Sequence, residues 1–214
     1  MLQYLYSLHK PVTESMKLLM LDTRTLPNWQ LRVLPTEVAH LITSLTRVMQ
    51  PKHTLVVGVY TGLGLLSTAS MTQYSGTTIG LEYPALAADW RAVGKKFADQ
   101  SPTLRKKIHF RDRESIQTSL ATLEQQGSAQ FDFILLDDMD LSARLLDYES
   151  CVKLLRSGGL LLVNNILADG DVLSTGPLAA GVAARRLNER IKSDYRVFAS
   201  FLPLGGGVAL LVKQ

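Results

Sequence analysis

The 214-residue sequence has little cysteine and little histidine, with one Cys and four His. A single cysteine, Cys151, excludes an internal disulfide framework and is typical of a reducing compartment. Because Cys151 lies in an apolar stretch with helical spacing, we expect a buried structural thiol rather than a nucleophile. No histidine has an obvious partner for acid–base chemistry, which disfavours a histidine-dependent mechanism.

Long apolar runs and dense charge clusters are also missing. No run approaches the ~20 apolar residues that span a bilayer, and the N-terminus lacks a signal-peptide pattern. The net charge is +4, and the densest basic cluster, Arg105 to Lys107, has no interleaved aromatic residues. Such a cluster is typical of a solvated surface rather than a nucleic-acid interface. We therefore expect a cytoplasmic protein that binds neither membranes nor nucleic acid.

Length and composition are those of one globular domain, residues 1–214, with 46% apolar and 20% charged residues. Residues 1–50 are predicted to form a helical accessory segment: residues 1–30 show amphipathic spacing interrupted by Pro11 and ended by Pro27. Thr36 is a candidate N-cap for the next helix. Residues 51–214 are predicted to form an α/β core.

Strand and helix patterns alternate throughout that core. The expected strands are Thr54–Val59, Thr77–Leu81, Lys107–Phe110, Phe131–Leu136, Leu160–Val163, Arg196–Leu202 and Val208–Val212. Most of the intervening segments have helical spacing, including 84–99, 114–125, 141–155 and 178–192, and Ser157 to Gly159 is expected to form a turn. Alternation of this kind predicts a mostly parallel, doubly wound sheet with helices on both faces. The last two strands have only a short connector and must form an antiparallel hairpin.

The most informative segment is LVVGVYTGLGLLSTA, residues 55–69, which indicates a buried strand, a tight turn and the start of a helix. Gly58, Gly62 and Gly64 suit a turn that needs positive φ or the close approach of another group. In a parallel sheet this turn is where a nucleotide-like ligand lies, over a helix N-terminus. The G-x-x-x-G-x-G spacing differs from the dinucleotide fingerprint. A tight turn in an ordinary strand–helix unit is the alternative.

Polar residues follow the second and third predicted strands. A carboxylate at Glu82 is suited to accept the hydroxyl protons of a ribose and disfavours a 2′-phosphate, although a solvated strand-end acid has the same sequence signature. Asp112, Arg113, Glu114 and Ser115 follow the third strand, where such groups could bound an adenine. Ser115 could equally be a helix cap.

Further polar residues follow the fourth and fifth strands. Asp137, Asp138 and Asp140 come after the fourth, and Asn164 and Asn165 after the fifth. Carboxylate and amide oxygens at one sheet edge are hard ligands that suit Mg²⁺, Ca²⁺ or Mn²⁺. The alternative is that they cap helices and hold loops.

Together these pieces resemble the S-adenosylmethionine-dependent O-methyltransferases of the caffeoyl-CoA and catechol type. The similarity runs through nearly the whole chain and includes residues 26–42 (LPNWQLRVLPTEVAHLI), 56–69, 79–90 (IGLEYPALAADW), 131–140 (FDFILLDDMD), 156–167 (RSGGLLLVNNIL) and 201–213 (FLPLGGGVALLVK). It implies a Rossmann-like, seven-stranded, mostly parallel sheet with an antiparallel last strand. It also implies a homodimer, with which the amphipathic N-terminal helices are compatible, and methyl transfer to a hydroxyl of a small, aromatic acceptor.

The resemblance also implies a role for each strand-end residue. The cofactor S-adenosylmethionine would contact Gly58, Tyr60, Thr61, Gly62, Gly64, Glu82, Arg113, Glu114, Ser115 and Asp137. A divalent cation would be held by Asp137, Asn164 and Asn165. Asp137 or Asp138, depending on how the motif is aligned, would be the catalytic aspartate.

Four departures from the family pattern bear on mechanism. Val56 replaces a glutamate, Arg113 replaces a glycine, Asn164 replaces an aspartate, and the lysine after the fourth strand is absent. A cation site with fewer charges binds more weakly. Two alternatives therefore stay open beside the methyltransferase interpretation: a non-catalytic member that keeps the fold, and a metal-independent enzyme with another acceptor.

Overall fold

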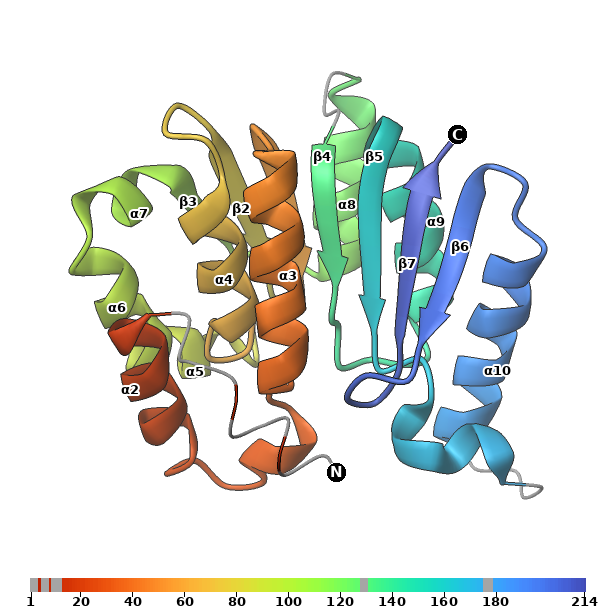
Figure 1. Ribbon diagram of the computed structural model, residues 1–214, viewed down its shortest axis with the longest axis horizontal. Helices are drawn as coiled ribbons and strands as arrows, with labels where there is room; N and C mark the ends of the chain where they lie inside the picture. The colour runs from red at the N-terminus through yellow and green to blue at the C-terminus, as the bar shows by residue number, and fades with distance from the viewer. Residues whose placement is uncertain (1–3, 5–7, 9–12, 128–130, 175–178) are drawn as a thin grey trace.

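The computed structural model describes Tyr4, Leu8 and residues 13–127, 131–174 and 179–214. Within these residues one seven-stranded sheet has the order β3-β2-β1-β4-β5-β7-β6 (Figure 1). The strands are β1 (His53–Val57), β2 (Thr77–Leu81), β3 (Ile108–Arg111), β4 (Phe131–Leu136), β5 (Leu155–Asn164), β6 (Val197–Leu202) and β7 (Val208–Lys213). Strands β1 to β5 pair in parallel, whereas β7 is antiparallel to both β5 and β6. The predicted fold is thereby confirmed.

Helices pack on both faces of this sheet. They are α2 (Glu14–Thr23), α3 (Thr36–Met49), α4 (Leu63–Met71), α5 (Ala87–Asp89), α6 (Lys95–Asp99), α7 (Pro102–Lys107), α8 (Ile116–Gln125), α9 (Arg144–Leu154) and α10 (Ala179–Lys192), with the 3₁₀ turns η1 (Trp29–Leu31) and η3 (Ala168–Leu173) and the π turn η2 (Trp90–Gly94). In Figure 1, α3 and α4 lie in front of the sheet, and α8 and α9 lie behind it. Among the described residues, no helix is long and apolar enough to cross a membrane.

Two apolar cores follow from the two-residue period of the strands. Leu55 and Val57 of β1 join the core beneath α8, α9 and α10, whereas Val56 between them joins the core beneath α2, α3 and α4. Val56, at the position where the resemblance implies a glutamate, is fully buried. Cys151 is also fully buried, and burial raises the pKa of its thiol, which confirms the expected structural cysteine.

The predicted helix over 84–99 is wrong as a single element, because the chain forms α5, η2 and α6 in succession. Gly94 ends the π turn, and a Cβ there would lie 2.0 Å from the carbonyl oxygen of Thr61. The π turn, which has one more residue per turn than an α-helix, thus lies where Gly94 packs very closely against the turn after β1. Sequence periodicity carries no sign of that contact.

Smaller corrections concern element ends. Thr36 is the first helical residue of α3 rather than its N-cap, which is Pro35. Strand β5 already begins at Leu155 and runs through the predicted turn at residues 157–159, with a register shift opposite the start of β4. Helix α7 was not predicted, although Ser101 caps it and Pro102 occupies its first position, a recognisable signal.

The accessory segment packs against the core. Helix α2 ends at Thr23, before Pro27, and buries Met16 and Leu19. The helical spacing predicted before Pro11 lies outside the described residues, except at Tyr4 and Leu8. The predicted start of the last helix, Leu178, also lies outside them. The carboxyl ends of β4 and β5 point toward the edge where η1, η3 and the β6–β7 loop gather (Figure 1).

Candidate active site

The turn after β1, residues 58–64, is here called the Gly turn. Gly58 has φ +87°, and a Cβ at this position would lie 2.5 Å from the carbonyl oxygen of Asp137. Only glycine therefore lets the ends of β1 and β4 approach so closely. Tyr60 also has positive φ, and Gly62 has φ +100° with the Trp90 ring packed against it. The turn is folded tightly and almost completely buried.

Glu82 holds the Gly turn through the main chain. Its Oε2 accepts hydrogen bonds from the N–H groups of Val59 at 2.9 Å and Tyr60 at 2.7 Å. Its Oε1 accepts a third from the N–H of Tyr83 at 2.9 Å. Burial raises the pKa of the Glu82 carboxyl, and these three N–H groups act in the opposite direction. Since a carboxylate has about four lone-pair sites, roughly one stays available for a ligand hydroxyl.

The accessory segment covers the outer side of the Gly turn, which the sequence did not reveal. The Arg32 guanidinium lies over the Tyr60 ring, 4.3 Å from its centre, and Arg32 Nη1 is 3.0 Å from Asp89 Oδ2. The hydroxyl of Thr23 donates to that of Thr61 at 2.9 Å. Among the described residues, Arg32 Nη2 and the Tyr60 hydroxyl are buried without a hydrogen-bond partner.

The residues after β3 lie at the neighbouring strand end. Ser115 is the N-cap of α8, and its Oγ accepts from the Thr118 N–H at 3.1 Å, so the cap alternative for this residue is confirmed. Glu114 Oε1 accepts from the Ser119 hydroxyl at 3.1 Å. Arg113 and Glu114 are exposed, which leaves them available to a ligand that extends beyond Glu82.

Asp137 and Asn164 meet where β4 and β5 end. Asn164 Nδ2 donates to Asp137 Oδ1 at 2.8 Å. Burial raises the pKa of Asp137 to about 7, against the lowering effects of this hydrogen bond and of the Arg144 charge. Asn164 Oδ1 is buried, with no partner in the described part of the chain. Asn165, with φ +53°, places its Oδ1 3.4 Å from the N–H of Asp169.

Asp138 points into the protein, away from Asp137. It is completely buried and accepts from the Tyr83 hydroxyl at 3.3 Å, and its pKa is affected by the neighbouring Asp147 carboxyl. Gln117 Nε2 donates to Asp147 Oδ1 at 2.9 Å. Burial raises the pKa of Asp138, and raises that of Asp147 to about 7. Burial therefore favours the neutral form of both carboxyl groups.

Arg144 joins the two strand ends from beneath, another contact absent from the sequence patterns. Its Nε donates to the carbonyl oxygen of Asp138 at 2.7 Å, and Nη2 donates to the same oxygen. Its Nη1 donates to the carbonyl oxygen of Asn164 at 2.6 Å and lies 3.4 Å from that of Asn165. Arg144 is therefore a cross-link between β4 and β5 directly behind the Asp137–Asn164 pair.

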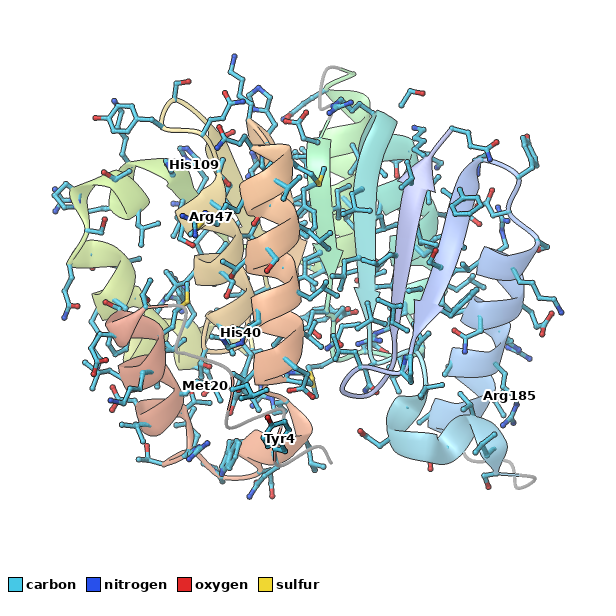
Figure 2. The ribbon with its side chains drawn as sticks, in the orientation of Figure 1. Tyr4, Met20, His40, Arg47, His109 and Arg185 are labelled. Atoms are coloured by element: carbon cyan, nitrogen blue, oxygen red, sulfur yellow. The ribbon has the colours of Figure 1, made fainter. Side chains whose placement is uncertain are left out.

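A polar cavity of about 70 Å³, here called the acceptor cavity, opens at this edge. One wall comes from residues 30–33 and Pro35. The other comes from Asp137, Met139, Arg144, Asn164, Asn165, Asp169 and Gly206, so the lining includes Asp137 but not Asp138. Arg185, labelled in Figure 2, donates from α10 to carbonyl oxygens of residues 171, 172 and 174 and fixes η3 beside the cavity.

The predicted cation ligands do not fit a divalent ion well. Asp137 is their only carboxylate, and Asn164 turns its amide nitrogen, rather than its oxygen, toward it. The Arg144 guanidinium supplies positive charge at the same place. Within residues 13–127, 131–174 and 179–214, no group of three or more His, Cys, Asp or Glu side chains is arranged to hold a metal.

Comparison with known proteins places this edge in context. A family model described as O-methyltransferase matches residues 7–214. The catechol O-methyltransferase domain-containing protein 1 of Mus musculus is 33% identical over 178 residues, which cover 83% of this chain and 66% of that protein, just under two thirds. The caffeoyl-CoA O-methyltransferase 2 of Zea mays is 30% identical over 207 residues, covering 92% of this chain and 75% of that protein.

Solved structures agree in fold. The SAH-bound methyltransferase PaMTH1 of Podospora anserina aligns with TM-score 0.84 and 20% identity over 99% of this chain and 93% of that chain. An O-methyltransferase from Bacillus cereus in complex with SAH aligns with TM-score 0.83 and 21% identity, over 99% and 96%. At such identities the likeness shows a shared fold.

Proposed function

Because the chain belongs to the O-methyltransferase family, we propose that it transfers a methyl group from S-adenosylmethionine to a hydroxyl of a small, aromatic acceptor. One observation carries the proposal. The Gly turn held by Glu82 and the acceptor cavity lined by Asp137 lie at the same edge of the sheet, where ligands of parallel α/β proteins bind.

The residues around the Gly turn are suited to hold the cofactor. The turn itself, through Gly58, Tyr60, Thr61, Gly62 and Gly64, would surround its methionine and ribose parts. Glu82 keeps capacity for a ribose hydroxyl, and the Tyr60 hydroxyl is buried with no partner in the described chain. Arg113, Glu114 and Ser115 would lie nearest the adenine. When bound, the cofactor supplies a methyl group on a positively charged sulfur.

The acceptor cavity is suited to orient and deprotonate a hydroxyl. Asp137 would accept the proton of the attacking hydroxyl, because one of its oxygens stays free of the Asn164 hydrogen bond. The unpartnered Asn164 Oδ1 would accept from a second, neighbouring hydroxyl. Leu31, Val33 and Met139 provide apolar walls for a ring. Asp138 would act indirectly, as a buried support.

Calorimetric titration with S-adenosylmethionine, with and without Mg²⁺, tests the cofactor assignment, and methyl transfer to a panel of catechols and hydroxycinnamates tests the reaction. We expect binding that Mg²⁺ does not alter, followed by turnover. An absence of binding under both conditions contradicts the cofactor assignment. Binding without turnover on any acceptor would support instead the non-catalytic alternative, which the buried Val56 and the missing lysine motivate.

We further propose a cytoplasmic homodimer. Support comes from Phe198 and Val212, which pair across β6 and β7 at the open edge of the sheet and are 65% and 41% exposed. The unpaired Cys151 fits a reducing compartment. Light scattering after gel filtration measures the assembly: wild type should elute as a dimer and Phe198→Glu as a monomer. An unchanged mass in the variant would contradict this surface as the interface.

A further inference from the structure

Arg144 is a buried cation whose hydrogen bonds go to the main chain. It is 3% exposed, and all three guanidinium nitrogens donate to carbonyl oxygens of Asp138, Asn164 or Asn165. The ion pairs found among the described residues do not include it. A buried charge is costly unless opposite charge lies near. Acidic side chains must therefore stabilise the Arg144 charge from a distance, without a direct ion pair.

The compensating charge comes from three acids around the guanidinium. Burial lowers the pKa of the Arg144 guanidinium, and the charges of Asp137, Asp138 and Asp147 act in the opposite direction. The hydrogen bonds to the main chain therefore hold one cation at a fixed position behind Asp137, with acids around it.

The position of that cation is informative. Arg144 lines the acceptor cavity together with Asp137, Asn164 and Asn165, the residues that the family resemblance assigns to a divalent cation. A second positive charge there would be repelled by the guanidinium, and the missing carboxylate at Asn164 would attract it less. Asn164 also already donates to Asp137.

We propose that the Arg144 guanidinium replaces the divalent cation as the fixed positive charge of the acceptor cavity. It is a positioning residue: it ties the ends of β4 and β5 together, so that Asn164 meets Asp137, and it favours negative charge on the acceptor oxygen during deprotonation. Its part in methyl transfer rests on the proposed function. Its exclusion of a cation does not, because that is a property of binding alone.

Mn²⁺ binding, measured by electron paramagnetic resonance, separates the two contributions to cation exclusion: the Arg144 guanidinium and the missing carboxylate at Asn164. Wild type should bind no Mn²⁺ at millimolar concentration. Asn164→Asp restores a carboxylate and should bind weakly. Adding Arg144→Met to Asn164→Asp should raise the affinity at least tenfold, because the guanidinium is then gone. Equal affinity of the single and double variants, or submillimolar binding by wild type, overturns the proposal.

Three further variants serve as controls for the place of the arginine, for its charge and for loss of structure. Arg185→Met with Asn164→Asp removes an arginine that also holds carbonyl oxygens, but from η3, and should bind Mn²⁺ no better than Asn164→Asp. Arg144→Lys with Asn164→Asp keeps the charge and should also stay weak. Arg144→Met and Asp147→Asn combined with Asn164→Asp remove a buried carboxyl group along with the guanidinium, in case Arg144→Met with Asn164→Asp fails to fold. Circular dichroism and S-adenosylhomocysteine binding verify each fold.

Steady-state kinetics provide the second measurement, and its first comparison needs only the wild-type protein. Activity in EDTA should equal activity in Mg²⁺, and Arg144→Lys should keep more of kcat than Arg144→Met at unchanged KM for S-adenosylmethionine. Loss of wild-type activity in EDTA with rescue by Mg²⁺ contradicts the proposal. If no acceptor is methylated while the Mn²⁺ results hold, the proposed function fails and the role of Arg144 in cation exclusion stands.

Discussion

The Gly turn and the acceptor cavity lie at one edge of the same sheet but are built differently. The main-chain N–H groups of the Gly turn donate to the Glu82 carboxylate, and Gly58 packs closely against the main chain of Asp137. The acceptor cavity is shaped by side chains, chiefly Asp137, Asn164 and Arg144. A geometry held by the main chain depends on few residue types, whereas a geometry held by side chains can change its chemistry while the fold stays the same.

Asp137→Asn should disable the acceptor cavity alone and have the largest effect. We expect kcat to fall by about 10²- to 10⁴-fold, because an amide cannot take the hydroxyl proton. Affinity for S-adenosylmethionine should persist, as calorimetry can verify. Since burial raises the pKa of Asp137 to about 7, wild-type kcat should rise as pH increases through that value. A variant that keeps wild-type kcat contradicts the assignment.

Gly58→Ala should damage the Gly turn through the main chain. Its Cβ would lie 2.5 Å from the Asp137 carbonyl oxygen at φ +87°, so we expect a loss of about 3 kcal/mol in the free energy of unfolding. Gly170→Ala is the matched control: φ is +99° but nothing lies within 4 Å, and the loss should be about 1 kcal/mol. If urea denaturation gave similar losses of unfolding free energy for both variants, the contact with the Asp137 carbonyl oxygen would not be the cause.

Glu82→Gln tests whether one carboxylate holds the turn. The amide group offers one acceptor oxygen to three N–H donors, so we expect a loss of about 1–3 kcal/mol in unfolding free energy. Affinity for S-adenosylmethionine should drop with it. Glu114→Gln, an exposed acid after β3, should change unfolding by less than about 0.5 kcal/mol. Equal effects of the two substitutions on urea denaturation would argue against a special role of Glu82.

Asp147→Asn should have an effect on stability that depends on pH. Burial raises the pKa of Asp147 from its ordinary range to about 7, so the stability it contributes is present at low pH and is lost as pH rises through 7. Relative to wild type, the variant should gain about 2 kcal/mol between about pH 5 and about pH 8.

Asp194→Asn should show the opposite pH dependence of stability relative to wild type. Arg196 holds the pKa of Asp194 well below its usual range, so its contribution is present above the unfolded pKa and lost as pH falls. This variant should be least stable, relative to wild type, near neutral pH. The same pH trend in both variants would contradict the assigned shifts.

Much of the fold follows from local patterns. Thr77–Leu81 and Phe131–Leu136 were predicted with the bounds that the structure has, because their apolar runs end at polar residues. The hairpin of β6 and β7 followed from the short connector alone. The break of residues 84–99 into α5, η2 and α6 did not, since it accompanies the contact of Gly94 with Thr61, far away in the chain.

The candidate site divides in the same way. The sequence placed Glu82, Asp137 and Asn164 at one sheet edge, because parallel strands end together. It did not reveal that Asp138 turns inward, that Arg32 covers Tyr60, or that Arg144 ties Asp138 to Asn164.

By itself, then, the sequence determined the order of strands and helices, the Gly turn and the residues that stand at strand ends. These depend on periodicity and on steric rules that act over a few residues. Tertiary structure decided which of those residues face the acceptor cavity and which charges surround them. Burial, pKa and cation exclusion depend on groups brought together across the sheet. Arg144 and Asn164 are 20 positions apart in the sequence, and the segment between them carries no pattern that records their contact.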